Sequence, residues 1–291
     1  MTSVAIYYFS GTGNTEIVSE LLANALEERG ASVDLVRMED ALQDAASISV
    51  AAHDLIGVAH PVHGFDVPRI VYTFVDALPP GQETPTFVFK TAGGLEDIND
   101  NASASAIARL RRKGYDAFYD RLFCMASNWL VRTEDALAKR LYTAAVAKTA
   151  HMSEEVLAGE EREMRAGLLS AALAKAVSVG EAFGGRAFGR LLRVTDACID
   201  CNTCIENCPV QNIRRQDGEI TFGWDCLWCM RCIYGCPTQA ISPRFMRFCV
   251  LKEGYHIRDL IADPGVDEDT IAWGKTDYSW KMKHYLQNVE V

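Results

Sequence analysis

Short apolar stretches alternate with amphipathic stretches along the first 130 residues of the chain. The apolar stretches have the length of buried strands and lie at residues 4–9, 33–38, 55–59, 86–89 and 118–125. Helical spacing of apolar positions is found between them, at residues 15–28, 68–78 and 103–113. Strands that alternate with helices predict an α/β fold with a doubly wound, parallel five-stranded sheet.

The next segment, residues 133–183, is rich in Ala, Leu, Lys and Glu and contains no proline, so it predicts helices that complete this first domain. The glycines of residues 183–190 interrupt that pattern and predict a linker at residues 184–193. We therefore expect a first domain at residues 1–183 and a small second domain at 194–243. The tail at 244–291 retains aromatic residues such as Phe245, Tyr255 and Tyr285, and is expected to pack.

Eight of the ten cysteines lie in two sets with the same spacing, C-x2-C-x2-C-x3-C-P. The first set is Cys198, Cys201, Cys204 and Cys208, and the second is Cys226, Cys229, Cys232 and Cys236. The second set begins 28 residues after the first, and the residues that follow each set also correspond. The segment is therefore an internal duplication.

This spacing is typical of ligands to iron–sulfur clusters, in which the fourth cysteine of each set binds the other cluster. We expect Cys198, Cys201, Cys204 and Cys236 to hold one [4Fe–4S] cluster, and Cys226, Cys229, Cys232 and Cys208 to hold the second. A pair of zinc sites is the alternative, because zinc also uses C-x2-C pairs. Four cysteines per set, closing on Cys-Pro, favour the clusters. The predicted second domain is a small α+β ferredoxin of the bacterial type.

The turn after the first strand has the composition of a phosphate-binding loop. Its residues are Ser10, Gly11, Thr12, Gly13, Asn14 and Thr15. Small residues there let a phosphate approach the backbone, and the amides at the following helix N-terminus stabilise its charge. The loop lacks the Gly-Lys-Ser/Thr of a nucleoside triphosphate loop and the spacing of a dinucleotide fingerprint. These features suit the monoester phosphate of FMN better than ATP or NAD.

This loop resembles the phosphate loop of flavodoxins, of the form Thr/Ser-x-Thr-Gly-x-Thr. Together with the cysteine sets, it makes the chain similar to the bacterial flavodoxin–ferredoxin fusion proteins, which are related to other iron–sulfur flavoproteins. The resemblance covers residues 3–130 and 194–243. It implies that Ser10, Thr12, Asn14 and Thr15 hold the FMN phosphate.

The resemblance also implies three further contacts with the flavin ring, since flavodoxin-like sheets bind FMN between the first and third strands. The loop Pro61, Val62, His63, Gly64 and Phe65 resembles a Pro-Val-Tyr-Gly loop, with His63 at the aromatic position. Phe65 is then a candidate stacking residue, and Gly64 a candidate partner of flavin N5. Thr91, Ala92, Gly93 and Gly94 resemble the second flavin loop, or form an ordinary turn. Asn128 lies in a segment that resembles a Met-Pro-x-Asn-Tyr motif.

The net charge of -10 argues against a nucleic acid partner, because phosphate binding needs clustered cations. An acidic surface fits a carrier that docks on basic partner proteins, or only maintains solubility. No secretory signal is evident at the N-terminus, and no apolar run reaches about 18 residues. Reduced cysteines in such numbers then favour a cytoplasmic protein without a membrane span.

The leading hypothesis is an electron carrier that exchanges low-potential electrons between a redox partner protein, the clusters and FMN. The alternative is an enzyme whose FMN reduces a quinone or a tetrapyrrole, with His60 or His63 as proton donor. A redox sensor is a third class. No second nucleotide fingerprint is found, so NADH and NADPH are not expected as donors. Exposed clusters suggest an anaerobic host, and a homodimer that pairs FMN with the partner's clusters stays open.

Overall fold

A computed structural model describes residues 1–94, 97–164, 168–274 and 277–287. Its first part is one five-stranded parallel sheet in the order β2-β1-β3-β4-β5. The strands are β1 (Ser3–Tyr8), β2 (Ser32–Arg37), β3 (Leu55–Pro61), β4 (Thr84–Ala92) and β5 (Tyr115–Cys124). The expected doubly wound sheet is confirmed. β5 starts before the predicted residue 118, because an alternation of buried and exposed residues, from Tyr115 to Phe118, extends this edge strand.

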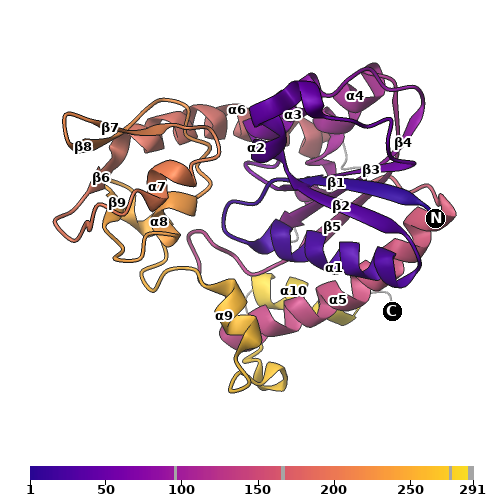
Figure 1. Cartoon of the computed structure of the whole chain (residues 1–291). Helices are drawn as coiled ribbons and strands as arrows, with labels where there is room; N and C mark the ends of the chain where they lie inside the picture. Colours follow the sequence, from indigo (N-terminus) through magenta and orange to yellow (C-terminus); the bar gives the residue numbers. More distant parts are fainter. Residues whose placement is uncertain (95–96, 165–167, 275–276, 288–291) are drawn as a thin grey trace.

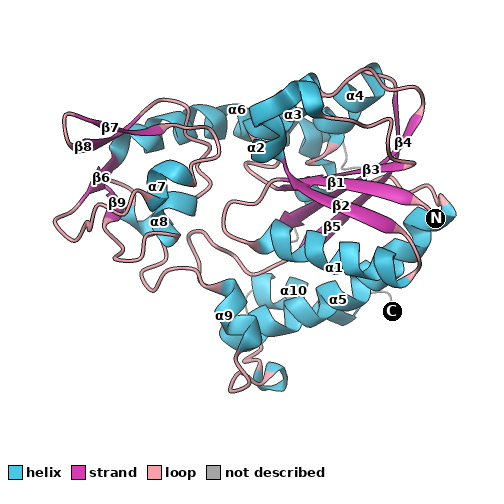
Figure 2. Ribbon diagram, in the orientation of Figure 1, coloured by secondary structure: helices cyan, strands magenta, loops and turns pink. Residues whose placement is uncertain are grey.

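Helices cover both faces of the sheet (Figure 2). The helices of this part are α1 (Asn14–Glu28), α2 (Met38–Ala41), α3 (Arg69–Ala77), α4 (Ala104–Arg112) and α5 (Asp135–Ala158). Val4 and Ile6 of β1 pack in one core with α1 and α5, whereas Ala5 and Tyr7 pack in the other with α3 and α4. A sheet buried on both faces requires the continuous apolar strands of the sequence.

The second part of the chain, residues 192–243, is here called the cysteine module. β6 (Leu192–Val194) pairs with β9 (Ile241–Pro243), and β7 (Ile213–Gln216) pairs with β8 (Glu219–Phe222). Each cysteine set contains one short helix, α7 (Thr203–Glu206) or α8 (Arg231–Tyr234). Phe188, Ile213, Phe222 and Ile241 share a core with five of the eight motif cysteines. The small α+β module that the duplication predicts is confirmed.

The linker expected at residues 184–193 is wrong, because α6 runs without a break over Leu168–Leu191 and β6 follows at once. The glycines in this part of α6 allow the helix to pack closely against the cysteine module. A Cβ atom added to Gly189 would lie 2.4 Å from Cys226 Cβ, and one added to Gly185 would lie 3.3 Å from Trp228 Cβ. Phe188 stacks on Trp228 with ring centroids 5.1 Å apart. Figure 1 shows α6 passing from the sheet to the cysteine module.

The C-terminal segment contains α9 (Ile257–Ala262) and α10 (Asp277–Gln287). Ile257 joins the core beneath α1, while Met282 packs against Leu137 and Leu141 of α5. Leu251 belongs to the core of the cysteine module. The segment therefore packs on both parts of the chain; Tyr255 lies against these cores, whereas Phe245 is exposed. None of the helices among the described residues combines the length and the apolar character needed to cross a membrane.

Candidate functional site

The loop between β1 and α1 presents an uncapped helix N-terminus. Gly13 precedes α1 with a φ of 106°, which glycine adopts without strain, and no side chain caps the helix. The first amides of an α-helix have no acceptor within the helix, and the helix dipole adds positive potential there. The Gly13 amide donates to Ser10 Oγ at 3.1 Å. The loop therefore leaves backbone amides of α1 without a side-chain acceptor.

The carboxyl ends of the strands bring three predicted loops to this helix N-terminus. Thr15 and Thr91 share a buried hydrogen bond of 2.7 Å between their hydroxyls. Asn128 Nδ2 donates to Thr12 Oγ1 at 2.6 Å. A Cβ atom added to Gly93 would lie 3.1 Å from Ser127 Cα. The phosphate loop, residues 91–94 and Asn128 are thus brought together.

The loop at residues 61–65 lies against α6. Gly64 and Phe65 both have positive φ, 52° and 63°, and the His63 amide donates to Asp66 O at 2.9 Å in a tight turn. A Cβ atom on Gly64 would lie 2.1 Å from Glu181 Oε2. Desolvation lowers the pKa of His63 to about 4, although a hydrogen bond to the Leu227 backbone opposes that shift. His63 is therefore neutral near pH 7.

His60 occupies a different environment from the one expected of a proton donor. The side chain is fully buried, and Nε2 lies 3.1 Å from Ser103 Oγ while Nδ1 lies 3.0 Å from Pro61 O. Burial lowers the pKa of His60 to about 4. Both ring nitrogens contact the protein interior, so His60 fixes the end of β3.

Two small cavities group the eight motif cysteines: one is lined by Cys198, Cys201, Cys204 and Cys236, and the other by Cys208, Cys226, Cys229 and Cys232. Burial raises the pKa of Cys204, and Cys236 and Cys201 raise it further. Burial raises the pKa of Cys232 well above its usual range, and the largest additional effects come from Cys229, Cys226 and Cys208. Each fourth cysteine therefore lies with the other set. Within the described ranges, no three Cys, His, Asp or Glu side chains converge on a single metal ion.

Backbone amides reach the sulfurs in a repeated pattern. The amide of Asn212 donates to Cys208 Sγ, and the amide of Ala240, its counterpart in the duplication, donates to Cys236 Sγ, both at 3.2 Å. Hydrogen bonds to the sulfurs are one determinant of cluster potentials. The two halves thus repeat the ligand loops and their hydrogen bonds.

The two halves differ in exposure. Cys201 is exposed, and the hydroxyl of Thr203 lowers the pKa of its thiol. Burial instead raises the pKa of Cys226 to about 12 and also raises that of Cys229. Cys201 of the first set therefore faces solvent, whereas no cysteine of the second set is exposed.

The second cysteine set is enclosed by the phosphate loop itself. A Cβ atom on Gly11 would lie 2.4 Å from Cys229 O, so the two backbones are in direct contact. Leu227 packs in the same core as Phe9. A cavity of about 340 Å³ lies beside this contact and is lined by residues 10–13, Thr203, Cys204 and Cys232, among others.

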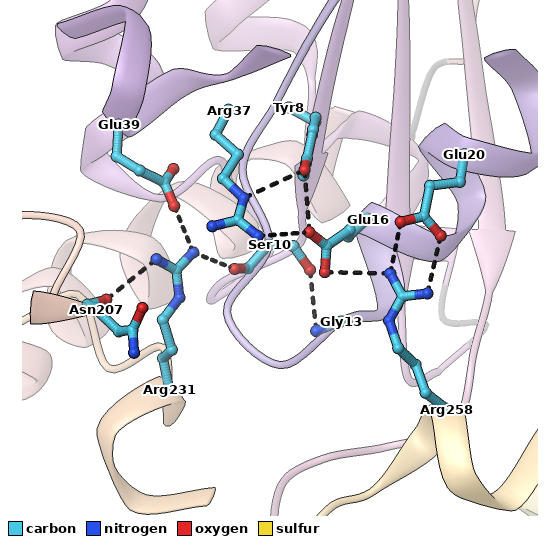
Figure 3. Close-up of polar contacts among 10 residues, drawn as sticks. All are labelled: Tyr8, Ser10, Gly13, Glu16, Glu20, Arg37, Glu39, Asn207, Arg231 and Arg258. Atoms are coloured by element: carbon cyan, nitrogen blue, oxygen red, sulfur yellow. Dashed lines mark hydrogen bonds and ion pairs between the residues drawn. The ribbon is translucent and has the colours of Figure 1, made fainter. Parts of the chain in front are cut away.

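Several charged residues at this cavity were not among the sequence-predicted site residues (Figure 3). Tyr8 OH donates to Glu16 at 3.0 Å, and Arg37 pairs with Glu16 at 3.1 Å. Arg258 pairs with Glu20 at 2.7 Å. Arg231 contacts Ser10, and the signal that points to it is its position within the second cysteine set. The others come from strands and helices whose meeting no local pattern reveals.

Comparison with known proteins agrees with both parts of the molecule. Residues 197–241 match the protein-family model described as a 4Fe-4S dicluster domain. The strand order β2-β1-β3-β4-β5 is that of flavodoxin-like sheets. The chain joins a flavodoxin-like domain to a 4Fe–4S dicluster domain. The dicluster match supports iron–sulfur clusters over zinc.

Solved structures similar to the first part of this fusion include two flavodoxins. One, from the domain Archaea, is 14% identical with a TM-score of 0.36, and the match covers 53% of this chain and 99% of that flavodoxin. Oxidised flavodoxin 1 from Bacillus cereus is 17% identical with a TM-score of 0.41, covering 54% and 98%. The rubredoxin oxygen:oxidoreductase from Desulfovibrio gigas is 18% identical with a TM-score of 0.37, covering 54% and 37%. No curated protein matches the chain.

Proposed function

We propose that this protein passes low-potential electrons between two [4Fe–4S] clusters and one FMN, to or from a redox partner protein in the cytoplasm. The observation that carries this proposal is the contact between Gly11 and Cys229. It joins the loop suited to a flavin phosphate to the loop suited to a cluster, within one chain. Transfer between the two cofactors then needs no second copy of the protein.

The phosphate loop fits FMN. The uncapped amides of α1, the left-handed Gly13 and the hydroxyls of Ser10, Thr12 and Thr15 are the groups that a monoester phosphate needs. Thr12 Oγ1 accepts from Asn128, which leaves its own proton to donate. When bound, FMN supplies one-electron and two-electron chemistry. The further ring contacts proposed for this site are Pro61, Val62, His63, Gly64, Phe65, Thr91, Ala92, Gly93, Gly94 and Asn128.

The eight thiols fit two clusters. Thiolates are the usual ligands of [4Fe–4S] clusters, and the crossed groups would supply four to each. The first group contains the exposed Cys201, so its cluster would meet a partner protein. The second group lies on the phosphate loop, so its cluster would meet the flavin. The proposed route therefore runs from the partner to the first cluster, the second cluster and FMN, or the reverse.

An electron carrier is favoured over a reductase by the space beside the flavin loop. The cavity lined by His63, Asp66, Tyr72 and Glu181 measures about 180 Å³. Pockets for drug-sized ligands measure about 300–1,000 Å³. The larger cavity of about 340 Å³ at residues 10–13 is the space proposed for FMN itself. A quinone or a tetrapyrrole beside the bound flavin would then have only the smaller space, whereas electron transfer to a protein needs no such cavity.

Anaerobic mixing of the cofactor-loaded protein tests this function. Reduced ferredoxin, NADH and NADPH are offered in turn, and the flavin and cluster absorbances are followed separately. Reduced ferredoxin should bleach both cofactors, while quinones and tetrapyrroles should not reoxidise them in repeated turnovers. Catalytic reoxidation by one small molecule would instead make the protein a reductase.

A further inference from the structure

The duplicated cysteine sets differ at one position that lies between two ligands. Arg231 stands between Cys229 and Cys232 in the second set, and its counterpart 28 residues earlier is Thr203. Thr203 directs its hydroxyl to Cys201 Sγ, 3.3 Å away, within its own loop. Arg231 instead leaves its loop. At this position, a cation is therefore present only in the copy that lies against the phosphate loop.

The Arg231 guanidinium touches three other segments (Figure 3). It donates through Nη2 to Ser10 O at 2.5 Å and through Nη1 to Asn207 O at 3.2 Å. It also pairs with Glu39 Oε1 at 2.6 Å. Ser10 belongs to the phosphate loop, Asn207 to the first cysteine set and Glu39 to α2. One side chain thus connects both cysteine sets to the sheet.

The charges of this pair are largely removed from water. The Arg231 side chain is 19% exposed and that of Glu39 is 9% exposed. Apart from the ion pair, neither Glu39 oxygen has a hydrogen-bond partner among the described residues. The guanidinium also lies 5.6 Å from the centre of the Phe9 ring. A guanidinium does not deprotonate in proteins, so the cation is permanent.

Such a cation acts on the nearer cluster. Reduction adds negative charge to a cluster, and a buried positive charge favours that state because little water screens it. Arg231 stands between Cys229 and Cys232, and its guanidinium contacts Asn207, the neighbour of Cys208, so its charge lies among three proposed ligands of the second cluster. The corresponding position in the first set is the neutral Thr203.

We propose that Arg231 is a positioning residue that ties the second cluster to the FMN phosphate loop and makes that cluster more readily reduced than it would be without the cation. The cation would thereby favour the arrival of an electron at the cluster beside the flavin. The negative charge of Glu39 reduces the effect of the cation. The neutral Thr203 has no such effect on the first cluster. This inference rests on the proposed function for the presence of both clusters and FMN.

Potentiometric titration followed by electron paramagnetic resonance tests the charge. In Arg231→Gln the second cluster should become harder to reduce, while the first keeps its potential. Arg231→Lys should restore most of the shift, because it restores the charge. Glu39→Gln should move the second cluster in the opposite direction, towards easier reduction. A general loosening of the structure would not give shifts of opposite sign.

FMN affinity tests the contact with the phosphate loop. The Kd for FMN, measured by fluorescence, should rise about tenfold in Arg231→Gln and less in Arg231→Lys. Arg215→Gln is the matched control, since Arg215 pairs with Asp200 of the first set at 3.0 Å on the exposed surface. Water screens that pair, so the control should change neither the second cluster nor the Kd.

The proposal is overturned if both clusters shift together, if neither shifts, or if Glu39→Gln and Arg231→Gln act in the same direction. Should Arg231→Gln fail to assemble its clusters, as iron content would show, Glu39→Gln decides the matter with the arginine in place. The proposed function fails separately, when the unaltered protein does not pass electrons between clusters and FMN.

Discussion

The two halves of the cysteine module share a ligand pattern but not an environment. Both use the same spacing and the same amide-to-sulfur hydrogen bonds, at Asn212 and Ala240. The first half exposes Cys201, whereas the second lies against Gly11 of the phosphate loop. Under the proposed function, the local sequence would determine how a cluster is held, and the surroundings would determine with what it exchanges electrons. The predictions below test that division.

The largest difference should come from removing one ligand on each side. Cys232→Ser should lose the second cluster, about half of the bound iron, and with it the reduction of FMN by ferredoxin. Cys201→Ser should lose the first cluster but keep the flavin and the second cluster in contact. Iron content and anaerobic stopped-flow absorbance give both results. Equal rates of flavin reduction in the two variants would contradict the proposed order of the cofactors.

The acidic cavity beside the second half should make stability depend on pH. Burial and the charge of Asp66 raise the pKa of Glu181 from 4.5 to about 7. Between pH 4.5 and about 7, the folded state therefore binds the Glu181 proton more tightly than the unfolded state does. Its contribution, on the order of 1–3 kcal/mol, is complete below pH 4.5 and is lost as the pH rises to 7.

The check is the urea midpoint measured anaerobically from pH 5 to 8. Glu181→Gln cannot ionise, so it should flatten the decrease that the unaltered protein shows over this range. The facing groups His63, Arg69 and Tyr72 are the same in both proteins. A parallel decrease in the variant would assign the pH dependence to another group.

A methyl group at the contact between the phosphate loop and the second half should separate them. In Gly11→Ala the new Cβ would meet Cys229 O at 2.4 Å, and backbone lies on both sides. Overpacking of this kind costs about 1–3 kcal/mol of unfolding free energy. Urea unfolding and the rate of flavin reduction by the clusters should both decline. An unchanged rate would show that the contact does not matter for transfer.

The smallest effect concerns the glycines of α6. Gly189→Ala places a Cβ 2.4 Å from Cys226 Cβ, whereas nothing lies within 4 Å of the position at Gly180. Gly180→Ala should therefore stabilise the helix by about 0.5–1 kcal/mol. Gly189→Ala should lower the unfolding free energy and disturb the second cluster alone. Thermal unfolding and cluster resonance spectra distinguish the two, and equal stabilisation would refute the packing role.

The parts of the fold and site that follow from the sequence are those with local patterns. The strands, the phosphate loop and the cysteine sets each require particular residues at fixed spacing. The linker was misplaced because Gly185 and Gly189 are required by contacts with Trp228 and Cys226, far along the chain. Glu39 and its pairing with Arg231 were not found for the same reason. His60 was a candidate acid, but it is buried beside Ser103.

The unbroken helix α6 has a mechanical consequence for the electron route. Domains on a flexible tether must find each other by diffusion, so their transfer rates depend on tether length and on the viscosity of the solvent. A helix that packs in its middle on Asp66, through Ser178, and near its C-terminal end on Trp228, through Phe188, fixes the spacing of these two contacts. One inserted residue would turn everything beyond it by about 100°. The register of this helix thus sets the geometry of the contact between the flavodoxin-like domain and the cysteine module.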